Sequence, residues 1–339
     1  MTLIRSISGI RGTIGGAPGH GLTPIDVVRY SAAFGTLIRQ RNHSDRPRIV
    51  IGRDARTSGP MVRDLVAATL AGLGFNVIDL GLASTPTVEL AVTAEGAQGG
   101  VIITASHNPA QWNALKLLNG EGEFISAIDG QRVLELAEAG KFDFVPVEKI
   151  GTISPGQGWN RRHIEMVLDL DLVDTAAIKN AKFRVVVDAV NSVGGEVVPA
   201  LLTALGVQEV VCIHCSPDGN FPHDPEPLPE NLKDLCGAVK KHKASLGIAV
   251  DPDVDRLALV CEDGSLFGEE YTLVACADHV LATRPGDTVS NLSSTRALDD
   301  VAAKHGRKRH ASAVGEVNVV EMMKRCMHRS AGKATAASS

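Results

Sequence analysis

The chain has 339 residues, 44% of them hydrophobic, so it can build a sizeable core, and its length predicts two or three domains. Its formal net charge of −5 at pH 7 gives no general attraction to nucleic acid, and no apolar run reaches the roughly 18 residues that cross a bilayer. The start of the chain lacks the features of a secretory signal and the six cysteines are scattered, so we expect a cytoplasmic protein with neither a nucleic-acid nor a membrane partner.

One pattern recurs three times along the chain: an apolar strand, a polar turn, a helix and a second apolar strand. The strands of the three copies are expected at residues 48–52 and 76–80, 184–188 and 209–213, and 287–290 and 311–313. The helices between them are expected at residues 59–73, before residue 206 and at residues 295–305. This alternation predicts three tandem, related α/β domains with mixed, mostly parallel sheets covered by helices.

The same pattern suggests where the domains begin and end. Residues 151–158 are rich in glycine and polar residues, which is typical of a linker. We therefore expect domain I at residues 1–150, domain II at residues 151–250 and domain III at residues 251–324. Residues 325–339 contain no acidic residue and no strand pattern, so we expect this tail to be disordered.

A polar turn follows the apolar run at residues 100–103. It reads Thr-Ala-Ser-His-Asn-Pro over residues 104–109 and carries a hydroxyl, an imidazole and an amide. Chemistry in α/β proteins commonly gathers at such strand ends. Ser106 is the candidate nucleophile, because phosphoryl transfer through a protein hydroxyl needs that group near cations and hydrogen-bond donors. Taken alone, the stretch could equally be an ordinary turn.

Three carboxylates stand at alternate positions, Asp251, Asp253 and Asp255, after the apolar run at residues 246–250. Alternate residues of an extended chain point the same way, so their oxygens could converge on one hard cation. A calcium loop is disfavoured, since Arg256 occupies the position that needs glycine and the flanks read as strands. A structural role without a metal is disfavoured by the mutual repulsion of the carboxylates. A hydroxyl nucleophile with such a cage indicates phosphoryl transfer.

Other polar residues are open to more than one interpretation. Lys116 lies among leucines and could be a strand-borne lysine of the site or a solvated edge charge. Arg11 stands between two glycines, which suits anion binding, although such turns are common. Cys212 and Cys215 have no second cysteine pair that would complete a zinc site, so we interpret them as structural. The loops at residues 54–58 and 218–223 could contact a substrate, but turn chemistry explains both.

Four stretches together resemble the α-D-phosphohexomutase superfamily, which includes phosphoglucomutases, phosphomannomutases and phosphoglucosamine mutases. They are Ser-Gly-Ile-Arg-Gly at 8–12, Gly-Arg-Asp-Ala-Arg at 52–56, the serine turn at 104–109 and Asp-Pro-Asp-Val-Asp-Arg at 251–256. The resemblance covers residues 1 to about 324. It implies that Ser106 carries a phosphoryl group and that this group, Asp251, Asp253 and Asp255 bind Mg²⁺. It also implies that Arg11, Lys116 and Arg256 line the transfer site, with His107 and Lys116 as candidates for proton transfer.

The implied activity is that of an isomerase that interconverts hexose 6-phosphate and hexose 1-phosphate through a phosphoserine and a hexose 1,6-bisphosphate. The sugar could be glucosamine, mannose or glucose. Pro252 and Val254 replace glycines of the family's metal loop, and we expect their side chains to point away from the metal.

In the family, a smaller fourth domain follows the three α/β domains and grips the phosphate group that is not being transferred. We expect that domain to be absent here and mutase activity to be impaired. The alternatives are a Mg²⁺-dependent sugar-phosphate phosphatase or an inactive metal-binding fragment.

Overall fold

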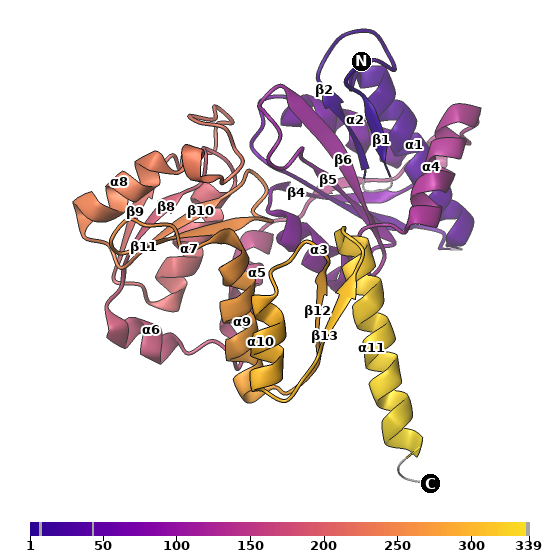
Figure 1. Ribbon diagram of the computed structural model, residues 1–339. Helices are drawn as coiled ribbons and strands as arrows, with labels where there is room; N and C mark the ends of the chain where they lie inside the picture. Colours follow the sequence, from indigo (N-terminus) through magenta and orange to yellow (C-terminus); the bar gives the residue numbers. More distant parts are fainter. Residues whose placement is uncertain (7–8, 43, 337–339) are drawn as a thin grey trace. The chain divides into compact units, whose positions relative to one another are not determined.

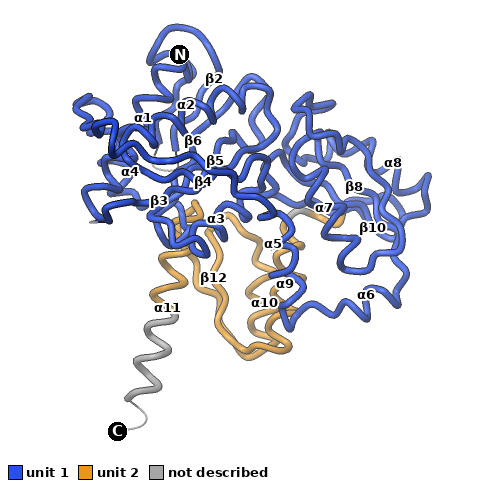
Figure 2. The backbone as a smooth tube through the Cα atoms, turned by 180° about the vertical axis from the view of Figure 1, so that it is seen from behind, with its two compact units in different colours: residues 1–266 blue, residues 267–339 orange. Residues whose placement is uncertain are grey.

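The computed structural model describes residues 1–6, 9–42 and 44–336 (Figure 1). The chain divides into two compact units, residues 1–266 and residues 267–339 (Figure 2). Among the described residues, none of the helices combines the length and apolar character that a membrane crossing requires.

The first unit begins with a mixed seven-stranded sheet. Its strands, in spatial order, are β1 (Ile4–Ser6), β2 (Gly9–Thr13), β6 (Trp112–Asn119), β5 (Gly99–Ile103), β3 (Arg48–Arg53), β4 (Asn76–Leu82) and β7 (Ile153–Pro155). Strands β5, β3, β4 and β7 are parallel, whereas β1, β2, β6 and β5 pair antiparallel. Because β5 and β6 are antiparallel neighbours, with Ile102 opposite Lys116, the turn after β5 and the first residues of β6 lie at the same end of the sheet.

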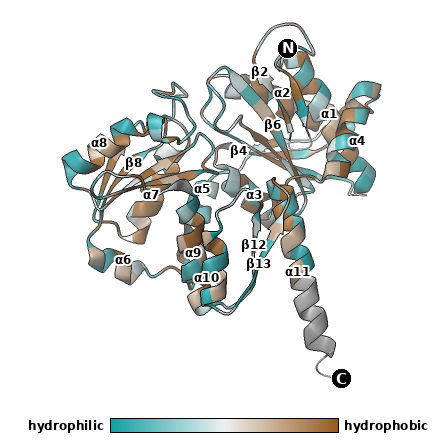
Figure 3. Ribbon diagram, in the orientation of Figure 1, coloured by the Kyte–Doolittle hydropathy of each residue, from teal (hydrophilic) through white to brown (hydrophobic). Residues whose placement is uncertain are grey.

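Helices cover both faces of this sheet. One hydrophobic cluster joins the sheet to α1 (Pro24–Arg41), α2 (Gly59–Gly72) and α4 (Ala127–Ala139). A second cluster joins the opposite face to α3 (Thr85–Ala94) and to the first residue of α5 (Trp159–Leu168). Figure 3 shows the hydrophobic residues concentrated on the strands and on the helix faces that meet them. Burial on both faces explains why β3 and β5 read as continuous apolar runs.

A four-stranded sheet forms the second part of this unit, in the order β11 (Leu257–Cys261), β10 (Leu246–Val250), β8 (Arg184–Asp188) and β9 (Glu209–Ile213). Strands β10, β8 and β9 are parallel, and β11 returns antiparallel to β10. One core cluster includes residues of α7 (Gly194–Leu205) and the other includes residues of α8 (Lys233–His242). The remaining helical segments are α6 (Thr175–Ala181) and the short 3₁₀ helices η1 (Val147–Lys149) and η2 (Pro229–Asn231).

The second unit holds a two-stranded parallel sheet of β12 (Thr288–Asn291) and β13 (Arg309–Ser312). Its helices are α9 (Glu269–Thr283), α10 (Ala297–Lys304) and α11 (Glu316–Ala336). Asp278 of α9 accepts hydrogen bonds from Lys304 and from His305 at the end of α10, which ties these two helices together.

The three predicted strand–helix–strand copies are confirmed. They correspond to β3-α2-β4, β8-α7-β9 and β12-α10-β13. The predicted fold class of tandem α/β domains with mixed sheets is confirmed as well.

Two predicted boundaries differ from the structure. The expected linker at residues 151–158 contributes β7, which pairs in parallel with β4. The expected start of domain III at residue 251 falls inside the β10–β11 hairpin, because all five residues of β11 pair with β10. The loop with the three aspartates therefore belongs to the second sheet, and the unit boundary lies after residue 266.

The tail after residue 324 was expected to be disordered, but α11 continues through Ala336. Seven of the twelve residues from 325 to 336 are alanine, arginine, methionine or lysine, which have high helix propensity. Residues 337–339 of this tail lie outside the described part of the chain.

Candidate active site

The turn after β5 holds Ser106 in an uncommon conformation. Its φ of 48° lies in the left-handed region, and its backbone N–H donates to Thr104 Oγ1 at 2.9 Å. Such strain persists only where the surroundings enforce it, and it is most common at functional sites. The Ser106 hydroxyl donates to Asp251 Oδ2 at 2.7 Å, and its oxygen lies 3.3 Å from His107 Nδ1 and 3.4 Å from Asp255 Oδ1.

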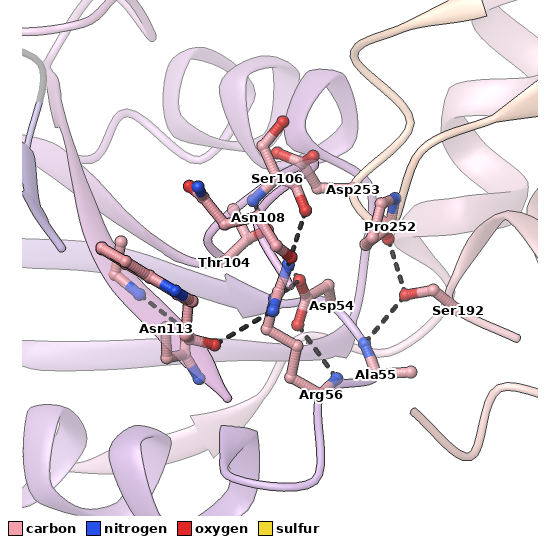
Figure 4. Close-up of polar contacts among 12 residues, drawn as sticks. Asp54, Ala55, Arg56, Thr104, Ser106, Asn108, Asn113, Ser192, Pro252 and Asp253 are labelled. Carbon is pink, nitrogen blue, oxygen red and sulfur yellow. Dashed lines mark hydrogen bonds and ion pairs between the residues drawn. The ribbon is translucent and has the colours of Figure 1, made fainter. Parts of the chain in front are cut away.

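A fully buried arginine enforces this turn. The Nε–H of Arg56 donates to Asp54 Oδ2 at 3.0 Å, and its two terminal nitrogens donate to four main-chain carbonyls (Figure 4). The carbonyls belong to Ser106, Asn108, Pro109 and Trp112, at 2.6, 2.6, 2.7 and 3.0 Å. The five N–H donors of the guanidinium group are thus all used, which fixes the path of the chain from residue 106 to residue 112.

Asp54 and Ser192 extend this network. Asp54 Oδ2 also accepts the Thr104 hydroxyl at 2.7 Å, so the ion pair with Arg56 holds both ends of the turn. Ser192 accepts the N–H of Ala55 at 3.2 Å and donates to the carbonyl of Pro252 at 2.7 Å (Figure 4). A single buried hydroxyl therefore joins the loop after β3 to the aspartate loop.

The aspartate loop is a turn and not an extended segment. The N–H of Val254 donates to the carbonyl of Asp251, and Asp251 Oδ1 accepts the N–H groups of Asp255 and Arg256, each at 3.1 Å. Asp251, Asp253 and Asp255 do converge, with one oxygen of each lying within 4.8 Å of the others. The predicted convergence is correct, but its cause is the turn rather than the alternation of an extended chain.

Asp253 lies at the centre of the charge cluster. Its Oδ2 accepts the Thr85 hydroxyl at 2.6 Å and the Lys116 ammonium at 2.7 Å. Burial acts to raise the pKa of Asp253, but Lys116 outweighs that effect and lowers it to about 2. Its Oδ1 is buried and has no hydrogen-bond partner among the residues that the structure describes. A buried anionic oxygen without a hydrogen-bond partner destabilises the fold, and a cation bound beside this atom would remove that cost.

Lys116, on β6, bridges two of the carboxylates. Its Nζ donates to Asp253 Oδ2 and, at 2.8 Å, to Asp255 Oδ2. Burial acts to lower the pKa of Lys116, but the two aspartates more than offset it and raise the pKa above its usual value. The predicted strand location is correct, and in this arrangement Lys116 is a cation.

The three carboxylates also suit a divalent cation. Burial, with the charges of Asp253 and Asp255, raises the pKa of Asp251 well above its usual value. Three crowded carboxylates therefore exceed the positive charge that Lys116 supplies. All three offer hard oxygen ligands, which magnesium and calcium prefer.

Val254 was expected to be a harmless replacement for glycine in this loop. Its φ is 61°, a left-handed conformation that β-branched residues rarely adopt. The position thus has a backbone reason to favour glycine, and the expectation based on side-chain direction alone missed it. The Val254 side chain packs against the core cluster that contains α7 residues, which offsets part of the strain.

Two arginines flank His107. Burial lowers the pKa of His107, and the charges of Arg256 and Arg11 lower it further, so the imidazole is held neutral. Arg256 also donates to Glu226 Oε1 at 2.8 Å. Arg11 lies exposed on β2.

The structure thus brings together six of the predicted residues: Ser106, His107, Lys116 and the three aspartates. The positive charges of Arg11 and Arg256 act on His107 in this group. Sequence reasoning missed Arg56 and Glu226. It interpreted residues 54–58 as an ordinary turn, although an Asp-x-Arg pair directly after a buried strand was the available signal.

Comparison with known proteins identifies the family of this chain. The models for domains I, II and III of phosphoglucomutase/phosphomannomutase match residues 3–143, 161–264 and 268–332. The chain belongs to this family. The predicted resemblance to the α-D-phosphohexomutase superfamily is therefore confirmed.

Two curated relatives have names consistent with the family. A phosphoglucomutase/phosphomannomutase of Thermococcus kodakarensis is 36% identical over 316 residues, which are 92% of this chain and 68% of that protein. A probable phosphoglucosamine mutase of Methanopyrus kandleri is 33% identical over 92% of this chain and 66% of that protein. The chain therefore spans about two thirds of the length of these relatives.

Among solved structures, a phosphoglucomutase/phosphomannomutase family protein from Burkholderia thailandensis matches with a TM-score of 0.82 and 27% identity. The match covers 96% of this chain and 70% of the Burkholderia protein. The relatives are phosphohexomutases, which favours a mutase over a phosphatase.

Proposed function

We propose that this chain provides the phosphoryl-transfer centre of a hexose-phosphate mutase, with Ser106 as the residue that accepts and returns the phosphoryl group. The observation that supports this most directly is the position of the Ser106 hydroxyl. It lies 2.7 Å from Asp251 Oδ2 and beside a cluster in which one lysine bridges two further carboxylates. Phosphoryl transfer depends on positioning and on charge stabilisation, and this cluster supplies both.

In the half-reaction with a hexose 1,6-bisphosphate, residues of this chain can take up and supply the protons that the transfer requires. The bond between phosphorus and the sugar oxygen breaks as the bond between phosphorus and Ser106 Oγ forms. His107 Nδ1, at 3.3 Å from Ser106 Oγ, accepts the hydroxyl proton as a neutral imidazole. The Lys116 ammonium is the candidate donor of a proton to the leaving sugar oxygen. The reverse half-reaction returns the phosphoryl group to the other sugar hydroxyl.

Mg²⁺ is the divalent cation that we propose for the three aspartates. When bound, it would add positive charge against the phosphoryl oxygens. Asp251, Asp253 and Asp255 would hold it. The cation would supply a partner for Asp253 Oδ1, which is buried and has no hydrogen bond among the described residues. Arg11 and Arg256 would then orient the phosphoryl group through their guanidinium groups.

The substrate class that we propose is a hexose monophosphate with its bisphosphate as intermediate. The names of the relatives divide among glucose, mannose and glucosamine phosphates, so the proposal stops at the hexose.

The test is transfer of one phosphoryl group from glucose 1,6-bisphosphate to the protein in the presence of Mg²⁺. Intact-mass measurement should show the adduct in the wild-type chain, and peptide mapping should place it on Ser106. Ser106→Ala should remove it, whereas Ser154→Ala, which changes an exposed serine of β7, should not. An adduct that persists in Ser106→Ala would show that the nucleophile lies elsewhere.

A further inference from the structure

A second group of potential metal ligands lies at the ends of β8 and β9. Asp188 is the last residue of β8, His214 follows β9, and His223 lies in the loop beyond it. Asp188 Oδ2 is 3.0 Å from His214 Nδ1 and 3.1 Å from His223 Nε2. The aspartate is 1% exposed, while the histidine side chains keep 23% and 18% of their surface exposed. The group is therefore anchored in the core and open on one side.

The hydrogen bonds of His223 require a positive charge at this point. Its Nδ1 lies 2.8 Å from the carbonyl oxygen of Asp224, which can only accept, so Nδ1 carries a hydrogen. Its Nε2 faces Asp188 Oδ2, which as a carboxylate oxygen can also only accept. Two lone pairs would oppose each other unless a proton or a metal ion lies between them.

We propose that Asp188, His214 and His223 bind a transition-metal ion of the Zn²⁺ type. Metal-bound histidines commonly donate their other ring N–H to a main-chain carbonyl, as His223 does to Asp224. Ligand atoms about 3 Å apart are what zinc–nitrogen and zinc–oxygen bonds of about 2.0–2.2 Å produce. Imidazole ligands select zinc over magnesium, so this site is chemically distinct from the all-oxygen cluster at Ser106.

Zinc here would be structural. It would join two strand ends to the loop that carries Glu226, the ion-pair partner of Arg256. The backbone around the site is strained, with φ of 46°, 52° and 49° at Val190, Asn191 and His214. Strained residues persist only where further interactions hold them, and a bound metal is one such interaction. The Sγ of Cys215 donates to the carbonyl of Ile213 and is not among the three converging ligand atoms.

The experiment is calorimetric titration of the chelator-treated full chain with Zn²⁺. The titrations are made in the Asp253→Asn background with excess Mg²⁺, so that the aspartate cluster does not contribute. We expect one equivalent of Zn²⁺ to bind. His223→Ala and His214→Ala should each weaken binding by about tenfold or more. Cys212→Ser is the matched control, because it removes an exposed thiol of β9 and leaves the three ligands in place.

A stability measurement provides a second readout. Zn²⁺ should raise the Tm of the background chain and of Cys212→Ser by more than that of the histidine variants, because a ligand stabilises the fold in proportion to how tightly it binds. If His223→Ala does not fold, His223→Gln takes its place. Absence of Zn²⁺ binding, binding that survives both histidine changes, or binding lost with Cys212→Ser would each overturn the proposal. Absence of binding with a doubly protonated His223 ring in nitrogen NMR would show that a proton fills this position.

Discussion

At the scale of single residues, the site depends on buried groups that hold its loops in place. The Arg56 guanidinium group donates all five of its N–H bonds, to Asp54 and to four carbonyls of the Ser106 turn. Ser192 links the loop that carries Arg56 to the aspartate loop. These contacts set the position of the Ser106 hydroxyl relative to Asp251. A shift of about 1 Å in such a group can cost about a hundredfold in rate.

Arg56→Met should destabilise the fold by about 3–5 kcal/mol, because it leaves the buried Asp54 carboxylate and four carbonyls without their partner. Arg56→Lys keeps the charge but cannot form the planar set of bonds, so we expect a folded chain with slower phosphorylation of Ser106. Urea unfolding and the rate of phosphoryl incorporation measure the two effects. Arg63→Met, at a partly exposed ion pair, is the control and should change stability by less than about 1 kcal/mol. Equal stability of the Arg56→Met and Arg63→Met chains would contradict this account.

Asp253→Asn should weaken Mg²⁺ binding by about tenfold or more, since it removes one charged ligand and the orphaned anionic oxygen. Isothermal titration calorimetry of the two proteins gives the comparison. Asp263→Asn, at an exposed turn where the Asp263 carboxylate accepts hydrogen bonds from Ser265, should leave the affinity unchanged. Unchanged affinity in Asp253→Asn would place the cation at another site.

At the scale of elements, close backbone contacts decide how the first sheet ends. Gly151 donates its N–H to the carbonyl of Ala71, and its Cα lies so near Phe75 that a Cβ would come within 1.8 Å of the Phe75 carbonyl oxygen. The segment expected to be a free linker is therefore docked, and β7 follows from that docking.

Gly151→Ala should destabilise the protein by about 1–3 kcal/mol, because the added methyl group must displace main-chain atoms. Gly237→Ala is the matched control. Gly237 lies in α8 with open space where its Cβ would stand, so alanine there should stabilise the protein by about 0.5–1 kcal/mol. Thermal unfolding followed by circular dichroism should move Tm in opposite directions for the two variants, and a shift in the same direction would argue against the docking of β7.

The contact between α3 and α5 should make stability depend on pH. His163 Nδ1 lies 2.9 Å from Thr87 Oγ1, and burial lowers the pKa of His163. The unfolded chain therefore binds a proton more readily than the folded one, and the free energy of unfolding should fall as pH drops below the usual histidine value of about 6.5. His163→Gln should reduce that fall, as measured by urea unfolding at pH 7 and at about pH 5.5. An identical pH dependence in the variant would exclude His163 as its source.

At the scale of the whole molecule, the candidate site belongs to one unit. Every residue assigned to phosphoryl transfer lies within residues 1–266, which contain their own hydrophobic clusters on both sheets. The second unit has a separate parallel sheet with its own helices.

A shortened chain that ends at Leu266 should therefore fold and still take a phosphoryl group from glucose 1,6-bisphosphate onto Ser106. Intact-mass measurement tests the transfer, with the same shortened chain carrying Ser106→Ala as the control. A folded short chain without the adduct would show that residues beyond 266 are needed for the transfer itself.

The sequence alone determined the local elements and the identities of the reacting groups. Apolar periodicity predicted β3, β5, β8 and β10, because a buried strand must be apolar on both faces. The serine turn and the aspartate triplet were recognisable because a hydroxyl nucleophile and three closely spaced carboxylates together indicate phosphoryl transfer. The resemblance built on them was confirmed.

Only the tertiary structure decided which distant residues meet. Ser106 and Asp251 are 145 positions apart, and Arg56 reaches carbonyls about 50 positions away. The partners of Asp188 come from a strand end and a loop that no spacing rule connects. Local pattern constrains neighbours within an element, whereas these contacts depend on how parallel strands are ordered in a sheet, and that order is set by packing of the whole domain.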